Sequence, residues 1–86
     1  MKTITIYTTE LCPYCRRAKS LLIEKGAAFT EVDVTYDASE RKRMMARAGG
    51  RSSVPQIFIG EVHIGGCDDL FALQSKGGLD PLLASQ

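Results

Sequence analysis

The sequence predicts an α/β fold in which a four-stranded mixed sheet is flanked by helices, with the element order β-α-β-α-β-β-α. Stretches that alternate polar and apolar residues are separated by stretches in which apolar residues recur at helical spacing. A helix separates the first two strand-like stretches, which implies a parallel, right-handed crossover. Only Gly60-Glu61 separates the last two, which is typical of an antiparallel hairpin at the edge of the sheet.

The first half of the chain contains the expected parallel unit. Residues 3–7 alternate polar and apolar and are rich in β-branched side chains, so we expect them to form a strand. A helix is expected over residues 16–25, with Pro13 in its first turn and Gly26 as its C-terminal stop. Residues 28–34 alternate again, which predicts the second strand.

The middle of the chain is expected to add a helix and the hairpin. A helix over residues 40–48 has two candidate N-caps, Asp37 and Ser39, because both side chains can accept a hydrogen bond from the first turn. Residues 54–59 and 62–64 have the composition of short strands and form the two arms of the hairpin.

Two further helical segments are expected near the end of the chain. The first opens at Cys67 and runs to Gln74, and the acidic residues in its first turn suit the helix dipole. Asp80 is a candidate N-cap followed by a proline, so residues 81–85 are expected to form a last helical turn.

Length and composition limit the possible classes of protein. Eighty-six residues with 44% hydrophobic side chains suffice for one small domain, residues 1–86, and no more. An odd number of cysteines, three, argues against a secreted disulfide framework. The sequence shows neither a signal peptide nor an apolar run long enough to cross a bilayer. We expect a cytoplasmic protein that acts as a monomer.

The charged residues point to no extended partner. A formal net charge of +1 gives no general attraction to nucleic acid or to a membrane, and neither is expected as a partner. No aromatic residues interleave with the basic ones, which further disfavours nucleic-acid binding. One basic cluster is open to two interpretations, a solvated helix face or a patch that steers a charged substrate: Arg41, Lys42, Arg43, Arg47 and Arg51.

The stretch Cys12-Pro13-Tyr14-Cys15, placed between a strand and a helix, predicts a redox-active pair. Cys12 would lie at the helix N-terminus, where unbonded N–H groups and the helix dipole favour a thiolate. Cys15 follows about one turn later, within disulfide reach. The alternative is a zinc site made of Cys12, Cys15, His63 and Cys67, but a second C-x-x-C or a C-x-x-H would be needed for a strong zinc signature.

Three separate segments carry a resemblance to a known family: Cys12-Pro13-Tyr14-Cys15, Ser53-Val54-Pro55 and Gly65-Gly66-Cys67-Asp68-Asp69. Together, in this order and at these spacings, they make the chain similar to the glutaredoxins, and most of all to the bacterial glutaredoxin 3-like, dithiol CPYC type. The resemblance extends from the first strand to Leu83. It implies a thioredoxin fold and a glutathione-dependent thiol–disulfide oxidoreductase.

The resemblance also implies roles for individual residues. Cys12 would be the nucleophile and Cys15 the resolving thiol, with glutathione as reductant and no metal. Disulfide-containing or glutathionylated proteins would be the other partners. Val54, before a cis-proline, would pair its backbone with glutathione, and the full binding set would be Tyr14, Ser53, Val54, Pro55, Gly66, Cys67 and Asp68.

One position departs from the family pattern. Glutaredoxins commonly carry a lysine three residues before the first cysteine, where a cation stabilises a thiolate and pairs with the glycyl carboxylate of glutathione. Thr9 occupies that position here, and Arg16 or Arg51 could supply the missing charge.

Two alternatives to glutathione-dependent reduction stay open at this point. The first is a thioredoxin-like carrier reduced by a flavoenzyme, although thioredoxins carry a tryptophan beside the cysteine pair and this chain has none. The second is an iron–sulfur cluster-binding protein that uses Cys12 and external glutathione. Cys15 and the rigid Pro13 count against that second role.

Overall fold

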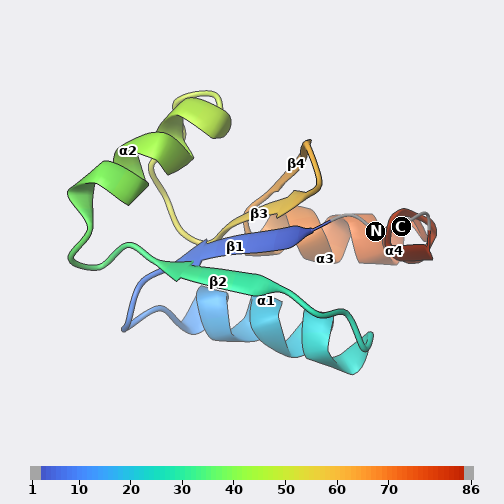
Figure 1. Ribbon diagram of the computed structural model, residues 1–86. Helices are drawn as coiled ribbons and strands as arrows, with labels where there is room; N and C mark the ends of the chain where they lie inside the picture. The colour runs from blue at the N-terminus through green and yellow to red at the C-terminus, as the bar shows by residue number, and fades with distance from the viewer. Residues whose placement is uncertain (1–2, 85–86) are drawn as a thin grey trace.

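A four-stranded mixed sheet forms the centre of the molecule, as the computed structural model, which describes residues 3–84, shows (Figure 1). The strands lie in the order β2-β1-β3-β4. The central strand β1 (Ile4–Thr8) pairs in parallel with β2 (Thr30–Asp33) and antiparallel with β3 (Gln56–Ile59). The edge strand β4 (Val62–Gly65) completes the hairpin with β3. The predicted mixed sheet is therefore confirmed.

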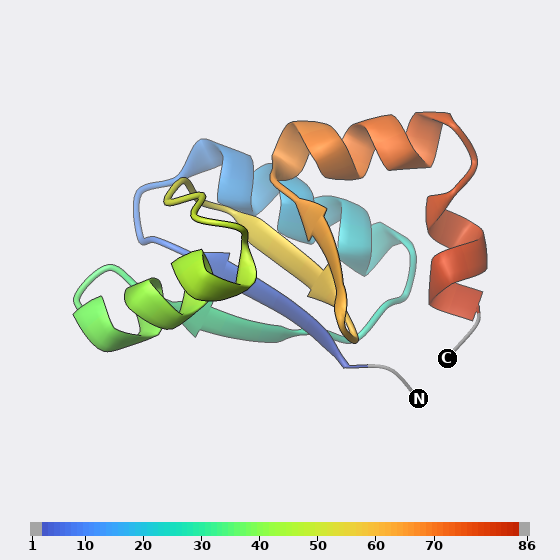
Figure 2. The ribbon, with the colours of Figure 1, turned by 90° about the horizontal axis from the view of Figure 1, so that it is seen from above.

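Helices cover both faces of this sheet (Figures 1 and 2). On one face lie α1 (Pro13–Glu24) and α3 (Cys67–Ser75), and the short α4 (Leu79–Ala84) follows α3 near the C-terminus. On the other face lies α2 (Ala38–Arg47). None of these helices, all within residues 3–84, is long and apolar enough to cross a membrane.

The period-two alternation of the strands divides the core into two clusters. Ile6 and Ile57 face α1 and α3, whereas Tyr7 and Phe58, their immediate neighbours, face α2. All four side chains are buried, and each such apolar side chain contributes about 1.5–3 kcal/mol on removal from water. The core therefore fixes both the register of β1 against β3 and the sides on which the helices pack.

Several boundaries differ from the sequence-based expectation. Helix α1 begins at Pro13, as expected for the proline of its first turn, whereas β3 begins at Gln56, two residues later than expected and just after the proline that lacks an N–H donor. The prediction that Asp80 is an N-cap was wrong. Helix α4 begins at the fully buried Leu79, and the Asp80 carboxylate forms an ion pair with Lys25 instead, at 2.9 Å. Ser85 lies outside the described residues.

Candidate active site

Cys12 is the N-cap of α1, as the sequence predicted. Its sulfur accepts a hydrogen bond from the backbone N–H of Cys15 at 3.1 Å, and Pro13 occupies the first helical position. Cys12 is 8% exposed and Cys15 only 1%, so the two thiols differ in access although they lie one turn apart. A negative charge on the Cys12 sulfur would face the N–H groups at the start of a helix, which is the arrangement that activates cysteines.

Cys15 is held as a protonated thiol in the reduced protein. Burial raises the pKa of Cys15 to about 12, together with its hydrogen bond to the Cys12 sulfur and the negative charge there. A hydrogen bond from the backbone of Thr9 and the positive charge of Lys19 act in the opposite direction. Cys15 is therefore both protonated near neutral pH and almost inaccessible, whereas the Cys12 sulfur lies at the end of the helix.

A pocket of about 160 Å³ lies beside the pair. The carbonyl oxygen of Val54, one of its lining residues, is 3.9 Å from the Cys12 sulfur. The residues that line this pocket belong to the start of α1, the loop before β3 and the first turn of α3. These three segments lie close together in the ribbon (Figure 2). It is lined by all seven residues that the resemblance assigned to glutathione binding, and by two more: Tyr14, Arg51, Ser53, Val54, Pro55, Gly66, Cys67, Asp68 and Asp69.

A larger hollow, of about 800 Å³, lies elsewhere, at the end of the molecule where α1 meets β2. Lys25, Phe29 and Asp80 are among its lining residues, and no cysteine is. The smaller pocket is the candidate site, because the Cys12 sulfur lies 3.9 Å from the oxygen of Val54 in its wall, whereas no cysteine lines the larger hollow.

The buried side-chain amide of Gln56 holds the loop before β3. Gln56 is fully buried, and its side-chain nitrogen donates to the backbone oxygen of Ser53 at 3.0 Å. The other end of the amide lies 2.7 Å from Nε2 of His63, whose ring stacks on Phe58. The peptide bond between Val54 and Pro55 is cis, as the resemblance implied. These contacts hold the backbone of Val54 at the pocket.

The other wall of the pocket is the start of α3, which Asp69 caps. Its carboxylate accepts from the N–H of Gly66 at 2.8 Å and pairs with Arg51 at 3.1 Å. The Gly66 N–H, followed by Arg51, holds the pKa of Asp69 below its ordinary value. Gly65 has φ +114°, and a Cβ there would collide with the Asp69 carboxylate, so glycine is required. The resemblance had assigned a role only to the neighbouring Asp68, so the capping role of Asp69 was not foreseen; both side chains are exposed.

The nominal zinc ligands are not brought together. Within residues 3–84 there is no group of three or more histidine, cysteine or acidic side chains arranged to hold a metal ion. His63 faces Phe58 and Gln56, and burial lowers its pKa. Cys67 is buried as the first residue of α3, and that burial raises its pKa, so its thiol stays protonated.

The glutaredoxin family model matches residues 4–64, more than half of the chain. The chain belongs to the glutaredoxin family. It is 57% identical to glutaredoxin 3 of Escherichia coli (strain K12) over 83 residues, which cover 96% of this chain and 99% of the relative. A probable glutaredoxin of Synechocystis is 54% identical over 82 residues, 95% of this chain and 93% of the relative.

Solved glutaredoxins share the fold. The solution structure of a glutaredoxin from Brucella melitensis has a TM-score of 0.84 at 54% identity, over 96% of this chain and 89% of that one. The crystal structure of a buckwheat glutaredoxin–glutathione complex has a TM-score of 0.88 at 28% identity, over 98% of this chain and 78% of that one. The thioredoxin fold is therefore confirmed, and the protein is a glutaredoxin-family redox protein with a cysteine pair.

Proposed function

We propose that this protein is a glutathione-dependent thiol–disulfide oxidoreductase that reduces protein disulfides and protein–glutathione mixed disulfides. The observation that carries the proposal is the position of the Cys12 sulfur. It caps α1, where backbone N–H groups favour a thiolate, and it lies 3.9 Å from Val54 at the edge of a pocket large enough for part of a tripeptide.

In the first route, only Cys12 forms bonds. The Cys12 thiolate attacks the glutathione sulfur of a mixed disulfide, and the protein sulfur leaves with the electron pair of the broken bond and takes up a proton. A second glutathione thiolate then attacks the glutathione sulfur held on Cys12. This releases oxidised glutathione and restores the Cys12 thiolate, so electrons and atoms balance.

In the second route, Cys15 completes the reduction of a protein disulfide. Cys12 first attacks one sulfur of the substrate and forms a mixed disulfide with it. Cys15 then attacks Cys12, closes the Cys12–Cys15 bond and releases the reduced substrate. The helical spacing of three residues keeps the two sulfurs within reach of each other. Two glutathione molecules restore the dithiol.

The pocket offers complementary groups for glutathione. The backbone of Val54 is available to pair with an extended peptide, as in recognition by strand edges. The N–H groups in the first turn of α3, at Cys67 and Asp68, suit a carboxylate, while the Asp68 side chain suits an ammonium group. Tyr14, 58% exposed, would flank the tripeptide, and Ser53, Pro55 and Gly66 would complete the walls.

Arg51 is our choice for the cation that replaces the missing lysine at Thr9. Arg51 lines the pocket, and its guanidinium pairs with the carboxylate of Asp69 at 3.1 Å. Arg16, the other candidate, is exposed on α1 and is not among the residues that line the pocket. A guanidinium can bind a second carboxylate with its remaining N–H groups.

The test supplies electrons from two sources. The unsubstituted protein should reduce a mixed disulfide with glutathione and glutathione reductase, and should gain little activity from thioredoxin reductase alone. The Cys12→Ser variant should be inactive with either source. Efficient reduction by the flavoenzyme without glutathione would contradict the proposal and support the thioredoxin-like alternative. We propose that the protein works as a monomer in the cytoplasm, where thiols are kept reduced.

A further inference from the structure

The groups that set the pKa of Cys15 change when Cys12 forms a mixed disulfide with a substrate. In the reduced protein, burial raises the pKa of Cys15, and so do the hydrogen bond to Cys12 and the charge on it. Once the Cys12 sulfur is bonded to a substrate it carries no charge, so both of its contributions are lost. Burial is then the one remaining influence that raises the pKa of Cys15, and the backbone of Thr9 and the side chain of Lys19 still lower it.

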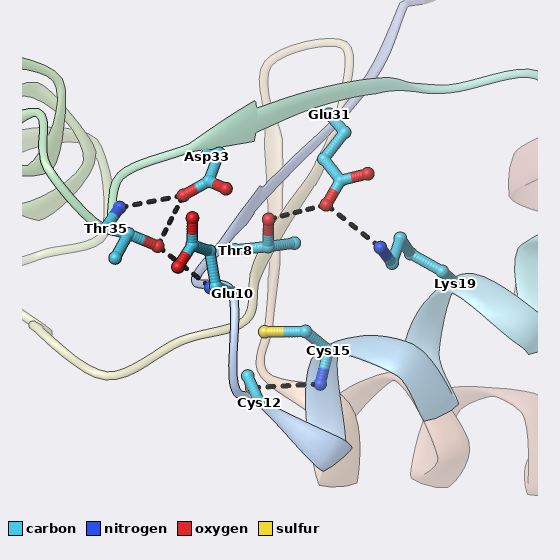
Figure 3. Close-up of polar contacts among 8 residues, drawn as sticks. All are labelled: Thr8, Glu10, Cys12, Cys15, Lys19, Glu31, Asp33 and Thr35. Carbon is cyan, nitrogen blue, oxygen red and sulfur yellow. Dashed lines mark hydrogen bonds and ion pairs between the residues drawn. The ribbon is translucent and has the colours of Figure 1, made fainter.

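An ion pair with β2 holds the side chain of Lys19. Lys19 follows Cys15 by four residues on α1 and so lies on the same side of the helix. Its Nζ pairs with Oε2 of Glu31 on β2 at 3.0 Å, and the same oxygen accepts from the hydroxyl of the buried Thr8 at 2.6 Å (Figure 3). The Thr8 hydroxyl, followed by Lys19, keeps the pKa of Glu31 below its ordinary value, so the partner of Lys19 stays charged.

Thr9 is held from both sides. Thr8 before it is bonded to Glu31, and the N–H of Glu10 after it donates to Oγ1 of Thr35 at 2.8 Å. The Thr35 hydroxyl in turn donates to Asp33 at 2.6 Å (Figure 3). The short loop between β1 and α1 is therefore tied to β2 and the residues that follow it, and with it the Thr9 backbone group that hydrogen-bonds to Cys15.

We propose that Lys19, held by Glu31, and the anchored backbone of Thr9 are positioning groups that prepare Cys15 to attack Cys12 once Cys12 carries a substrate sulfur. The inference rests on the second route of the proposed function. In this step the Cys15 proton passes to solvent and the Cys15 sulfur bonds to Cys12. The bond from Cys12 to the substrate sulfur breaks, and that sulfur leaves with the electron pair and takes up a proton.

An aromatic disulfide separates this step from the first attack. With dithiobis-nitrobenzoate, attack by Cys12 releases one coloured thiolate, and closure by Cys15 releases a second, in the same stopped-flow trace. All proteins carry Cys67→Ser, so that only the active-site thiols react. Lys19→Gln should slow the second release near neutral pH and move its pH profile upward, with the first release changed by less than about twofold.

The expected size of the effect follows from thiol chemistry. An opposite charge at close range shifts a pKa by about 1–3 units. Each unit changes the thiolate fraction tenfold but the intrinsic nucleophilicity about threefold in the other direction, which leaves a net change of about threefold per unit. Because Lys19 is partly solvated and affects the Cys15 pKa less than burial, Cys12 or Thr9 does, we expect the second release to slow about threefold in Lys19→Gln, the effect of about one unit.

Lys25→Gln is the matched control. Lys25 lies at the other end of α1 and forms an ion pair of 2.9 Å with Asp80, and the exposed fractions of the two lysine side chains are similar, 20% for Lys25 and 27% for Lys19. This variant should keep the normal second release, and Lys19→Arg should restore it because the charge returns.

Three outcomes would overturn the inference, and they differ in what they say about the function. Equal second-release rates in Lys19→Gln and Lys25→Gln would overturn it alone, as would a slow Lys19→Arg. The absence of any second release from the parent protein would overturn it together with the dithiol route. If Lys19→Gln slows the second release as expected but the parent protein cannot use glutathione, the inference about Lys19 holds and the proposed function fails.

Discussion

The two neighbouring acidic residues at the start of α3 are expected to respond differently to alanine. Asp69 caps the helix through the Gly66 N–H at 2.8 Å and pairs with Arg51. A capping side chain contributes about 0.5–2 kcal/mol, and an exposed ion pair adds about 0–1 kcal/mol. Since about 1 kcal/mol shifts the Tm of a domain this small by 4–8 °C, Asp69→Ala should lower the Tm by roughly 5–15 °C.

Asp68→Ala should instead affect the use of glutathione. Asp68 is exposed at the pocket, and its interaction with the helix dipole contributes only about 0.3–1 kcal/mol, so its loss should lower the Tm by less than about 8 °C. A charge-assisted contact with the ammonium group of glutathione, partly exposed to solvent, contributes about 1–2 kcal/mol. The KM for glutathione should therefore rise about five- to thirtyfold.

Thermal unfolding and glutathione-coupled initial rates, measured on both variants, decide between these roles. The pKa of Asp69 is lowered in the folded protein by the Gly66 N–H and by Arg51, so its stabilising effect is complete above the ordinary value of 3.8 and is lost as the pH falls through the lower folded value. The Tm difference between the parent and Asp69→Ala should shrink in that range. Equal Tm losses in the two variants, with an unchanged KM in Asp68→Ala, would refute the reasoning.

Cys12→Ser should abolish the reduction of both substrate types, whereas Cys15→Ser should still reduce glutathione mixed disulfides; an equal loss in both would contradict the first route. Burial lowers the pKa of His63, so stability should fall as the pH drops below the ordinary value of 6.5, because the unfolded chain binds the proton first. Urea unfolding of His63→Gln should show a flatter pH dependence there. Leu22→Ala, at a fully buried position, should cost about 2–5 kcal/mol, whereas Ile23→Ala, at a 66% exposed position, should cost about 0.5 kcal/mol or less in the same measurement.

The strands and helices could be predicted because each has a local pattern of its own. The alternation in β1 and the helical spacing in α1 are visible in the residues themselves, and Asp37, one of the two candidate caps of α2, does accept from the N–H of Glu40 at 3.0 Å. Asp80 was wrongly predicted to be an N-cap because an acidic residue before a proline is a common local signal for a helix start. Its actual partner, Lys25, comes from a distant segment, which no local pattern encodes.

The same limit applies to the basic cluster. The sequence offered a solvated face or a steering patch, but Arg47 lies over the ring of Phe58 at 4.2 Å and donates to the hydroxyl of Tyr7 at 3.0 Å. Arg41 donates to the backbone oxygen of Ser52, and Arg51 reaches Asp69. Part of the cluster therefore packs α2 and the loop after it onto the rest of the molecule, which depends on the register of segments far apart in sequence.

The cysteine pair shows how much of a site one short motif can determine. A spacing of three residues at the start of a helix places the first sulfur outside the helix, as its cap, and the second inside, against the core. The difference in access between Cys12 and Cys15 is therefore contained in the motif. The motif does not contain the groups that lower the pKa of Cys15, Lys19 and the backbone of Thr9. Glu31 on β2 holds Lys19, and the hydroxyl of Thr35, just after β2, holds the loop that contains Thr9. If the proposed roles of Lys19 and Thr9 hold, we expect a chain with the same motif and a different second strand to keep an N-capping Cys12 and to close the Cys12–Cys15 disulfide at a different rate.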